Sequence, residues 1–246
     1  MNDPLRAANA PSTVSALKAG ISKTAQNPPE RPEIDHRTMK LIVGVIAISL
    51  PLLTEWLTVY AGDAPLTSIS AAYYEQGWPQ EIFIGFLFAI AAFLLAYNGL
   101  CWTEMALGKL GAIAALVVAS FPCECGEHNE IIPGIHLIAA AIMFGVLAGF
   151  CYIFLRRARD KRQIRATARA VIYAICGVAL LGAIVVLGLY HFMGDPFRND
   201  YPRLVFFGEA IGLIAFGVSW LTASRTLPIL TRKDERFSVF RRNNPA

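Results

Sequence analysis

The chain has 246 residues, of which 55% are hydrophobic and 16% charged, with a formal net charge of +4 and a mean hydropathy of +0.48. Soluble domains carry about 25% charged residues, so this composition excludes an ordinary soluble enzyme. It also excludes disordered, collagen-like and disulfide-rich toxin classes, because apolar residues are abundant and cysteines are few.

The first 36 residues predict a disordered cytoplasmic tail. They are polar, rich in proline between Pro4 and Pro32, and show no apolar periodicity. No secretory signal is expected, because the first apolar run starts at residue 41, is too long for the core of a signal peptide, and contains Glu55.

Six apolar runs follow, each close to the 20 or so residues that a membrane-spanning helix needs. They cover residues 41–60, 82–100, 105–121, 135–155, 171–192 and 204–223. The third is the weakest, because Lys109 and glycines lie near its start, and four or five spans are the alternative. The predicted fold class is therefore all-α: a polytopic membrane protein with a six-helix bundle in residues 37–225 and a basic tail in residues 226–246.

The orientation follows from the positive charges. Of the 22 lysines and arginines, all but Arg198 and Arg203 lie in the tails and connections on one side. This asymmetry predicts that both termini face the cytoplasm. The tryptophans predict two interfacial belts, with Trp56 and Trp78 at the outer face and Trp102 and Trp220 at the inner one.

The basic stretch at residues 156–162 lies at the predicted cytoplasmic face. It is typical of a stop-transfer signal in contact with anionic lipids, and it is not interpreted as a nucleic-acid site.

Four ionisable side chains are predicted in the outer half of the bilayer, on four different helices: Glu55, His136, His191 and Glu209. Charged groups inside a span are costly, so their shared level indicates an outward-facing polar pocket. Such groups can bind metal, relay protons or act as general acid and base. We therefore take all four as candidate catalytic residues; the alternative is hydrated interfacial histidines and snorkelling glutamates.

The connection between the first two spans concentrates hydroxyl and phenol groups. Ser68, Ser70, Tyr73 and Tyr74 are candidate substrate-binding residues, on a segment long enough for a short interfacial or re-entrant helix. A serine nucleophile here would need a base from the histidine side. The Gly-x-Ser-x-Gly pattern of serine hydrolases is absent.

The third connection places Cys123, Cys125 and His128 within six residues, on the outer side. Thiolate and imidazole groups at this spacing are a candidate zinc or copper site, completed by Glu127, Glu130 or His136. The spacing is not the usual Cys-x-x-Cys of zinc sites. The alternatives are a bond between the two cysteines or an intermolecular disulfide.

Two pairs of glycines at four-residue spacing, Gly145/Gly149 and Gly208/Gly212, allow helix backbones to approach closely. We expect them to stabilise the bundle rather than to specify a dimer.

Several of these segments resemble a family of uncharacterised six-pass bacterial inner-membrane proteins. The resemblance rests on residues 68–74 (a SISxYY-type segment and its most specific part), 83–99 and 209–221, on Phe121-Pro122, and on His136 followed by Leu137. It covers residues 41–225 and implies a six-helix fold in the inner membrane, without a settled activity. The family has an apolar or proline-rich loop where this chain has Cys-Glu-Cys.

A fainter likeness is to membrane hydrolases of the ceramidase and progestin-receptor type. These enzymes use Ser, Asp and His at one membrane face, but they have seven spans and a His-x-x-x-His pair that is absent here, so the likeness is an analogy.

Three functions remain open at this stage. The first is a metal-assisted or acid–base hydrolase or transferase acting on a lipid or envelope intermediate. The second is a small proton-coupled transporter using Glu55 and Glu209. The third is a non-catalytic membrane partner or sensor. An enzyme predicts a metal or a closed outer pocket, whereas a transporter predicts polar residues that continue into the inner half.

Overall fold

The structure is a computed structural model that describes residues 35–125, 128, 132–161, 163–193, 200–227 and 230–231. It contains six long helices and one short 3-10 helix, η1 (Ser70–Tyr73), and the described residues form no strand. The long helices are α2 (His36–Ala61), α3 (Trp78–Ala96), α4 (Trp102–Ser120), α5 (Ile135–Asp160), α6 (Ile164–Phe192) and α8 (Leu204–Ser224).

The described residues confirm an all-α fold with six long helices, each long and apolar enough to cross a membrane. The third span, α4, has the lowest hydropathy but still qualifies. Three helices extend at least five residues beyond the apolar runs: α2 begins five residues before residue 41, α5 continues to Asp160 and α6 begins at Ile164. The predicted tail at residues 1–36 lies, apart from its last two residues, outside the described part.

The helices pack in chain order. Each contacts the next one along the chain, and α8 packs against α2, so that the six helices close into a ring. A further contact joins α5 to α8 across the ring. Consecutive helices run in opposite directions, as short connections require. Residues distant in sequence therefore meet at the two ends of the bundle.

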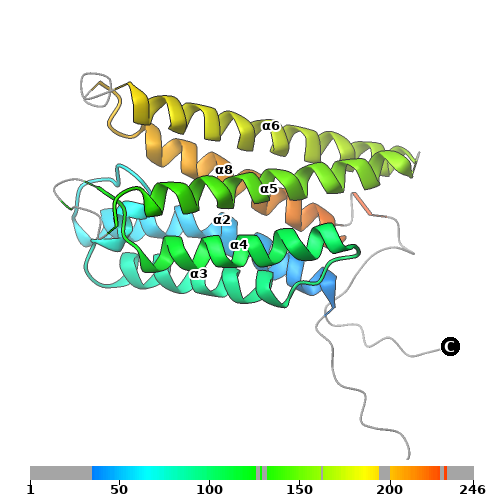
Figure 1. Cartoon of the computed structure of the whole chain (residues 1–246), viewed down its shortest axis with the longest axis horizontal. Helices are drawn as coiled ribbons and strands as arrows, with labels where there is room; N and C mark the ends of the chain where they lie inside the picture. Colours follow the sequence, from blue (N-terminus) through cyan, green and yellow to red (C-terminus); the bar gives the residue numbers. More distant parts are fainter. Residues whose placement is uncertain are drawn as a thin grey trace, which may run out of the picture. The chain divides into compact units, whose positions relative to one another are not determined.

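We name these two ends by a carboxylate that lies in each. The Glu209 end contains residues 62–77, the start of α5 and the start of α8. The Glu104 end contains residues 97–101, the start of α2 and the end of α8. Figure 1 shows the connections of the Glu209 end gathered together, opposite the start of α2.

The seam between α2 and α8 is a contact of backbone with backbone. A Cβ atom placed on Gly217 would lie 2.7 Å from the carbonyl oxygen of Gly44, and one on Gly44 would lie 2.9 Å from the carbonyl oxygen of Gly217. Only glycine fits at this distance, so these two residues set the closest approach of the ring.

The predicted glycine pairs behave differently from each other. Gly208 faces the side chain of Leu187 and Gly212 faces the ring of Phe144, so this pair packs inside the chain. Gly149 meets Leu107, whereas a Cβ on Gly145 would have no neighbour within 4 Å. The close packing expected of the pairs is thus seen at Gly208, Gly212 and Gly149, but not at Gly145.

An aromatic cluster fills the core toward the Glu104 end. The ring of Trp220 lies 5.1 Å from Phe216, 5.2 Å from Phe150 and 5.4 Å from Tyr97, between ring centroids. The prediction that Trp220 anchors the inner interface is therefore wrong: its side chain is fully buried. The other three predicted anchors, Trp56, Trp78 and Trp102, are exposed.

Candidate functional site

The centre of the candidate site is the carboxylate of Glu209, in the second turn of α8. One of its oxygens accepts the backbone N–H of Ile69 at 2.6 Å, and the other accepts the hydroxyl of Ser70 at 3.2 Å. The N–H groups at the start of η1 have no carbonyl partner within that short helix, so a carboxylate can satisfy them. Glu209 therefore holds the start of η1 against α8.

Glu209 and Ser70 line a cavity of about 30 Å³ together with His136 from the start of α5. A cavity of this size has room for about two water molecules. The rest of the wall is apolar and comes from the residue before η1 and from five helices: Leu50, Ile69, Phe83, Leu87, Val118, Ala140, Met143, Phe144 and Leu213. The three polar side chains are thus the hydrogen-bonding groups of an otherwise apolar chamber.

The tautomer of His136 follows from its partner. Its Nδ1 lies 2.7 Å from the carbonyl oxygen of Phe121, and because a carbonyl can only accept, Nδ1 must donate. In the neutral ring the lone pair then belongs to Nε2. His136 is 6% exposed, so this orientation is held by packing as well as by the hydrogen bond.

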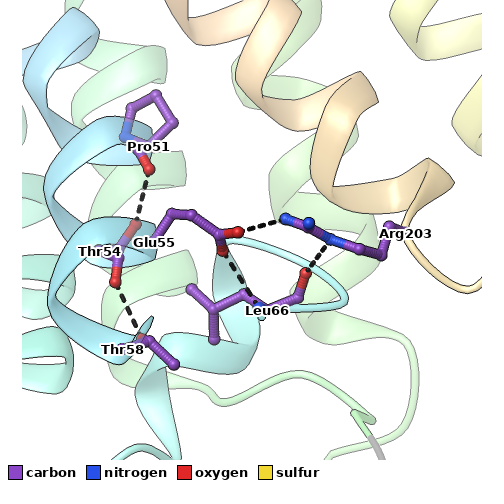
Figure 2. Close-up of polar contacts among 6 residues, drawn as sticks. All are labelled: Pro51, Thr54, Glu55, Thr58, Leu66 and Arg203. Carbon is purple, nitrogen blue, oxygen red and sulfur yellow. Dashed lines mark hydrogen bonds and ion pairs between the residues drawn. The ribbon is translucent and has the colours of Figure 1, made fainter. Parts of the chain in front are cut away.

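Glu55 lies at the same end but does not line the cavity. Figure 2 shows its carboxylate in an ion pair with Arg203 while it also accepts the backbone N–H of Leu66 at 3.1 Å. Arg203 in turn donates to the carbonyl oxygen of Leu66 at 3.2 Å. The Glu55–Arg203 pair therefore fixes both backbone groups of one loop residue to α2 and α8.

Thr54 and Thr58, also drawn in Figure 2, belong to the same turn of α2. The Thr54 hydroxyl donates to the carbonyl oxygens of Leu50 at 2.8 Å and Pro51 at 3.3 Å, and the Thr58 hydroxyl donates to that of Thr54 at 2.9 Å. These bonds satisfy buried hydroxyls within the helix around Pro51. The buried hydroxyls on either side of Glu55 therefore have their partners within α2.

Residues 66–70 are tied to the bundle at three points, and we call them the 66–70 segment. Leu66 is held by Glu55 and Arg203, Thr67 accepts the N–H of Phe206 at 3.0 Å, and Ile69 and Ser70 bind Glu209. Two of the four predicted catalytic residues thus position the connection that carries the predicted substrate-binding serines.

The other predicted residues of this connection have structural contacts. The Ser68 hydroxyl accepts the N–H of Ala71 at 3.0 Å and lies 3.4 Å from that of Ser70. Tyr74 donates its hydroxyl to the carbonyl oxygen of Cys123 at 2.7 Å, and the Tyr73 carbonyl accepts the amide of Gln80 at 2.5 Å. Of the four, only Ser70 lines the cavity.

His191 stands apart from the cavity. It lies in the last turn of α6, is exposed, and contacts the ring of Phe192 edge-on. Four side chains were predicted at the same depth of the bilayer. The structure brings two of them, His136 and Glu209, into one chamber; Glu55 and His191 do not line it.

The sulfur atoms of Cys123 and Cys125 are bonded to each other, so neither is a thiolate available to a metal. The ring of His128 stacks on that of Tyr74 at 3.9 Å between centroids. Among the described residues no three His, Cys, Asp or Glu side chains are grouped to hold a metal. The zinc or copper site is thus not supported by these residues; Glu127 and Glu130, its suggested further ligands, lie outside them.

This bond predicts a definite count of reactive thiols. In SDS without reductant, iodoacetamide should modify three cysteines, Cys101, Cys151 and Cys176, and after reduction all five. Intact-mass spectrometry measures both numbers. Five modifications before reduction would contradict the bond, and a dimer on a non-reducing gel would indicate an intermolecular bridge instead.

A second buried carboxylate, Glu104 at the opposite end, was not among the predicted site residues. It is fully buried, accepts the N–H of Leu100 at 2.6 Å and the hydroxyl of Tyr97 at 3.3 Å, and forms an ion pair with Arg157. Lys40, a residue that is 7% exposed, places its ammonium over the ring of the same Tyr97 at 5.4 Å. We call these four residues, Lys40, Tyr97, Glu104 and Arg157, the Glu104 cluster.

The sequence did contain a signal for this cluster. Glu104 precedes the third span and Arg157 follows the fourth, so the two opposite charges share a level on adjacent helices. Charges at the ends of spans usually lie in the hydrated interface, so position in the sequence alone does not indicate that this pair is buried.

Scans against family models, curated proteins and solved structures found no match to this chain.

Proposed function

We propose that this protein is a membrane-embedded hydrolase or transferase that uses acid–base chemistry at Ser70, Glu209 and His136 on a lipid or envelope intermediate. The observation that carries the proposal is the hydrogen bond from the Ser70 hydroxyl to Glu209 inside a chamber shared with His136. A hydroxyl bound to a carboxylate, with an imidazole beside them, is the arrangement that activates a nucleophile.

In this mechanism Ser70 Oγ attacks the carbonyl carbon of an ester or amide while its proton passes to Glu209. Glu209 then gives that proton to the departing alcohol or amine. Water next attacks the acyl-Ser70 ester and loses a proton to Glu209, which returns it to Ser70 Oγ as the carboxylic acid leaves. In a transferase an acceptor alcohol takes the place of water.

His136 is expected to orient the attacking water, since its Nε2 carries the lone pair that can accept a hydrogen bond. The chamber volume of about 30 Å³ suits this water and the reacting group. The hydrocarbon chains of a lipid substrate would stay in the bilayer.

The test is turnover by the purified full-length protein in mixed micelles. The probes are a fluorescent fatty-acyl phospholipid, a fluorescent ceramide and p-nitrophenyl butyrate, with release of fatty acid or nitrophenol as the signal. Ser70→Ala and Glu209→Gln should each lower the rate by about a hundredfold or more, the usual worth of a nucleophile–base pair. Ser120→Ala and Glu81→Gln, exposed residues at the same end, are matched controls expected to keep the wild-type rate.

Equal rates for wild type and both site variants, with unchanged melting temperatures, would refute the assignment. So would the absence of turnover of all three probes by the wild type.

A second candidate, proton-coupled transport, is favoured by the Glu104 cluster. Polar side chains buried at both ends of the bundle are what a transporter needs at two gates. Proteoliposomes containing a pH-sensitive dye test this directly: a proton flux lost in both Glu209→Gln and Glu104→Gln, without turnover of the probes, would favour it. A protein with neither activity would be the non-catalytic partner or sensor.

We further propose that the protein resides in the inner membrane with both termini in the cytoplasm and the Glu209 end outward. The distribution of lysine and arginine supports this orientation. A reporter fused after residue 246, or inserted between Asp160 and Ile164, should behave as cytoplasmic, and one inserted at residues 63–65 as extracytoplasmic. The reverse pattern at either site would overturn the orientation and place the chamber on the cytoplasmic side.

A further inference from the structure

A groove of about 350 Å³ lies on the surface of the bundle between α4 and α5, at the Glu104 end. On α5 it is lined at positions 149, 152, 153, 156 and 157, and on α4 at positions 103 and 107, which are single faces of the two helices. Its volume is in the range of small-molecule sites. Gly149 forms the floor of the groove, and a larger residue there would fill part of it, because even a Cβ would lie 3.3 Å from Leu107.

The groove has an apolar part and a cationic part. Leu107, Gly149 and Ile153 line the section nearer the middle of the bundle, and Arg156 and Arg157 line the section at its end. From Gly149 to Arg156 the helix rises about 10 Å. Apolar side chains toward the middle of the bundle and positive charge at its end are complementary to a lipid with a negative head group.

The charge at the head of the groove is not fully balanced by the protein. Arg157 forms an ion pair with Glu104 and reaches Cys101 Sγ with its other terminal nitrogen at 3.6 Å. Arg156 is exposed and lies over the ring of Tyr152 at 5.9 Å, and no ion pair to it is found among the described residues. Among the described residues only the guanidinium of Arg157 is paired with a carboxylate, so Arg156 adds a positive charge at this end of the groove.

We infer that this groove binds an anionic phospholipid, with the phosphate against Arg156 and Arg157 and one acyl chain along Leu107, Gly149 and Ile153. Guanidinium groups are well suited to phosphate because their N–H donors match its geometry. Basic pockets between membrane helices are known to bind anionic head groups. This site is separate from the Ser70–Glu209 chamber, and it does not depend on the proposed function.

Lipid selectivity and one charge variant test the head-group contact. The full-length protein is delipidated in detergent, titrated with phosphatidylglycerol or phosphatidylcholine of the same chains, and the first bound lipid is measured by native mass spectrometry. Phosphatidylglycerol should bind more tightly, and Arg156→Gln should weaken it about fivefold, the worth of one basic residue near an anionic head group. Arg159→Gln, an exposed arginine on the same helix outside the groove, is the matched control and should bind as the wild type does.

A second pair of variants tests the groove itself. Gly149→Leu fills the floor and should abolish the preference for phosphatidylglycerol, whereas Gly145→Leu, one turn away with no neighbour within 4 Å, should leave it intact. Melting temperatures establish that both variants fold. Equal affinity for the two lipids, an equal loss with Arg159→Gln, or unchanged binding by a folded Gly149→Leu would each overturn the inference.

Discussion

Glu104→Gln is expected to destabilise the folded protein by about 3 kcal/mol. Removing one partner of a buried ion pair leaves its counterpart uncompensated, which costs about 3–5 kcal/mol. The lower value applies because the Arg157 side chain is 34% exposed and can reach solvent. The residue Lys40 is 7% exposed, and both its ammonium and the Glu104 carboxylate contact Tyr97, so Lys40 loses the nearby negative charge as well. Reversible unfolding in detergent with increasing SDS measures the free energy.

Two further variants separate charge from packing. Glu81→Gln, an exposed carboxylate, should change the free energy of unfolding by less than about 0.5 kcal/mol. Lys40→Met in the Glu104→Gln background should recover part of the loss, because it removes the buried cation that Glu104 compensates. A loss below about 1 kcal/mol for Glu104→Gln alone would show that the Glu104 cluster does not stabilise the fold.

Gly217→Leu is expected to have a comparable effect through a different cause. Its Cβ would lie 2.7 Å from the backbone oxygen of Gly44, and a backbone atom cannot turn aside as a flexible side chain can. The helices α2 and α8 must then separate, which places the cost at or above about 3 kcal/mol, the upper end for overpacking. The same SDS titration measures it.

Gly145→Leu is the control, since the added side chain meets no neighbour within 4 Å and should leave stability unchanged. If Gly217→Leu proves as stable as this control, the α2–α8 seam cannot be as tight as described.

The six long apolar helices could be predicted because hydropathy reports directly on length and apolar content. The depth of a residue along its helix could also be predicted, since His136 and Glu209, 73 positions apart in the sequence, line the same chamber. The sequence does not predict which way a side chain points around its helix axis, since lipid-facing and core-facing positions are both apolar in a membrane protein. Trp220 and Glu55 show the consequence, because each lies at its expected end of the bundle yet faces a different neighbour from the one expected.

Contacts between side chains on different helices could not be predicted from the sequence. Arg203 was counted as one of two basic residues on the outer side, and its pairing with Glu55 depends on the contact between α2 and α8, which no local pattern encodes. The serines illustrate the same limit. Ser68 and Ser70 are two residues apart with similar surroundings in sequence, but only Ser70 reaches Glu209, because η1 begins at that residue.

The closed ring also has a consequence for biosynthesis. Helices that are neighbours in the sequence can pair while the ribosome is still extending the chain. The contact between α2 and α8 forms only after α8, the last helix, has been made. That helix brings Gly217 for the backbone contact, while Arg203, the residue just before it, neutralises Glu55. A nascent chain that ends before residue 203 therefore lacks the partner of the Glu55 carboxylate and leaves the glycine surface of α2 uncovered, a state in which an ionisable group is costly in the bilayer.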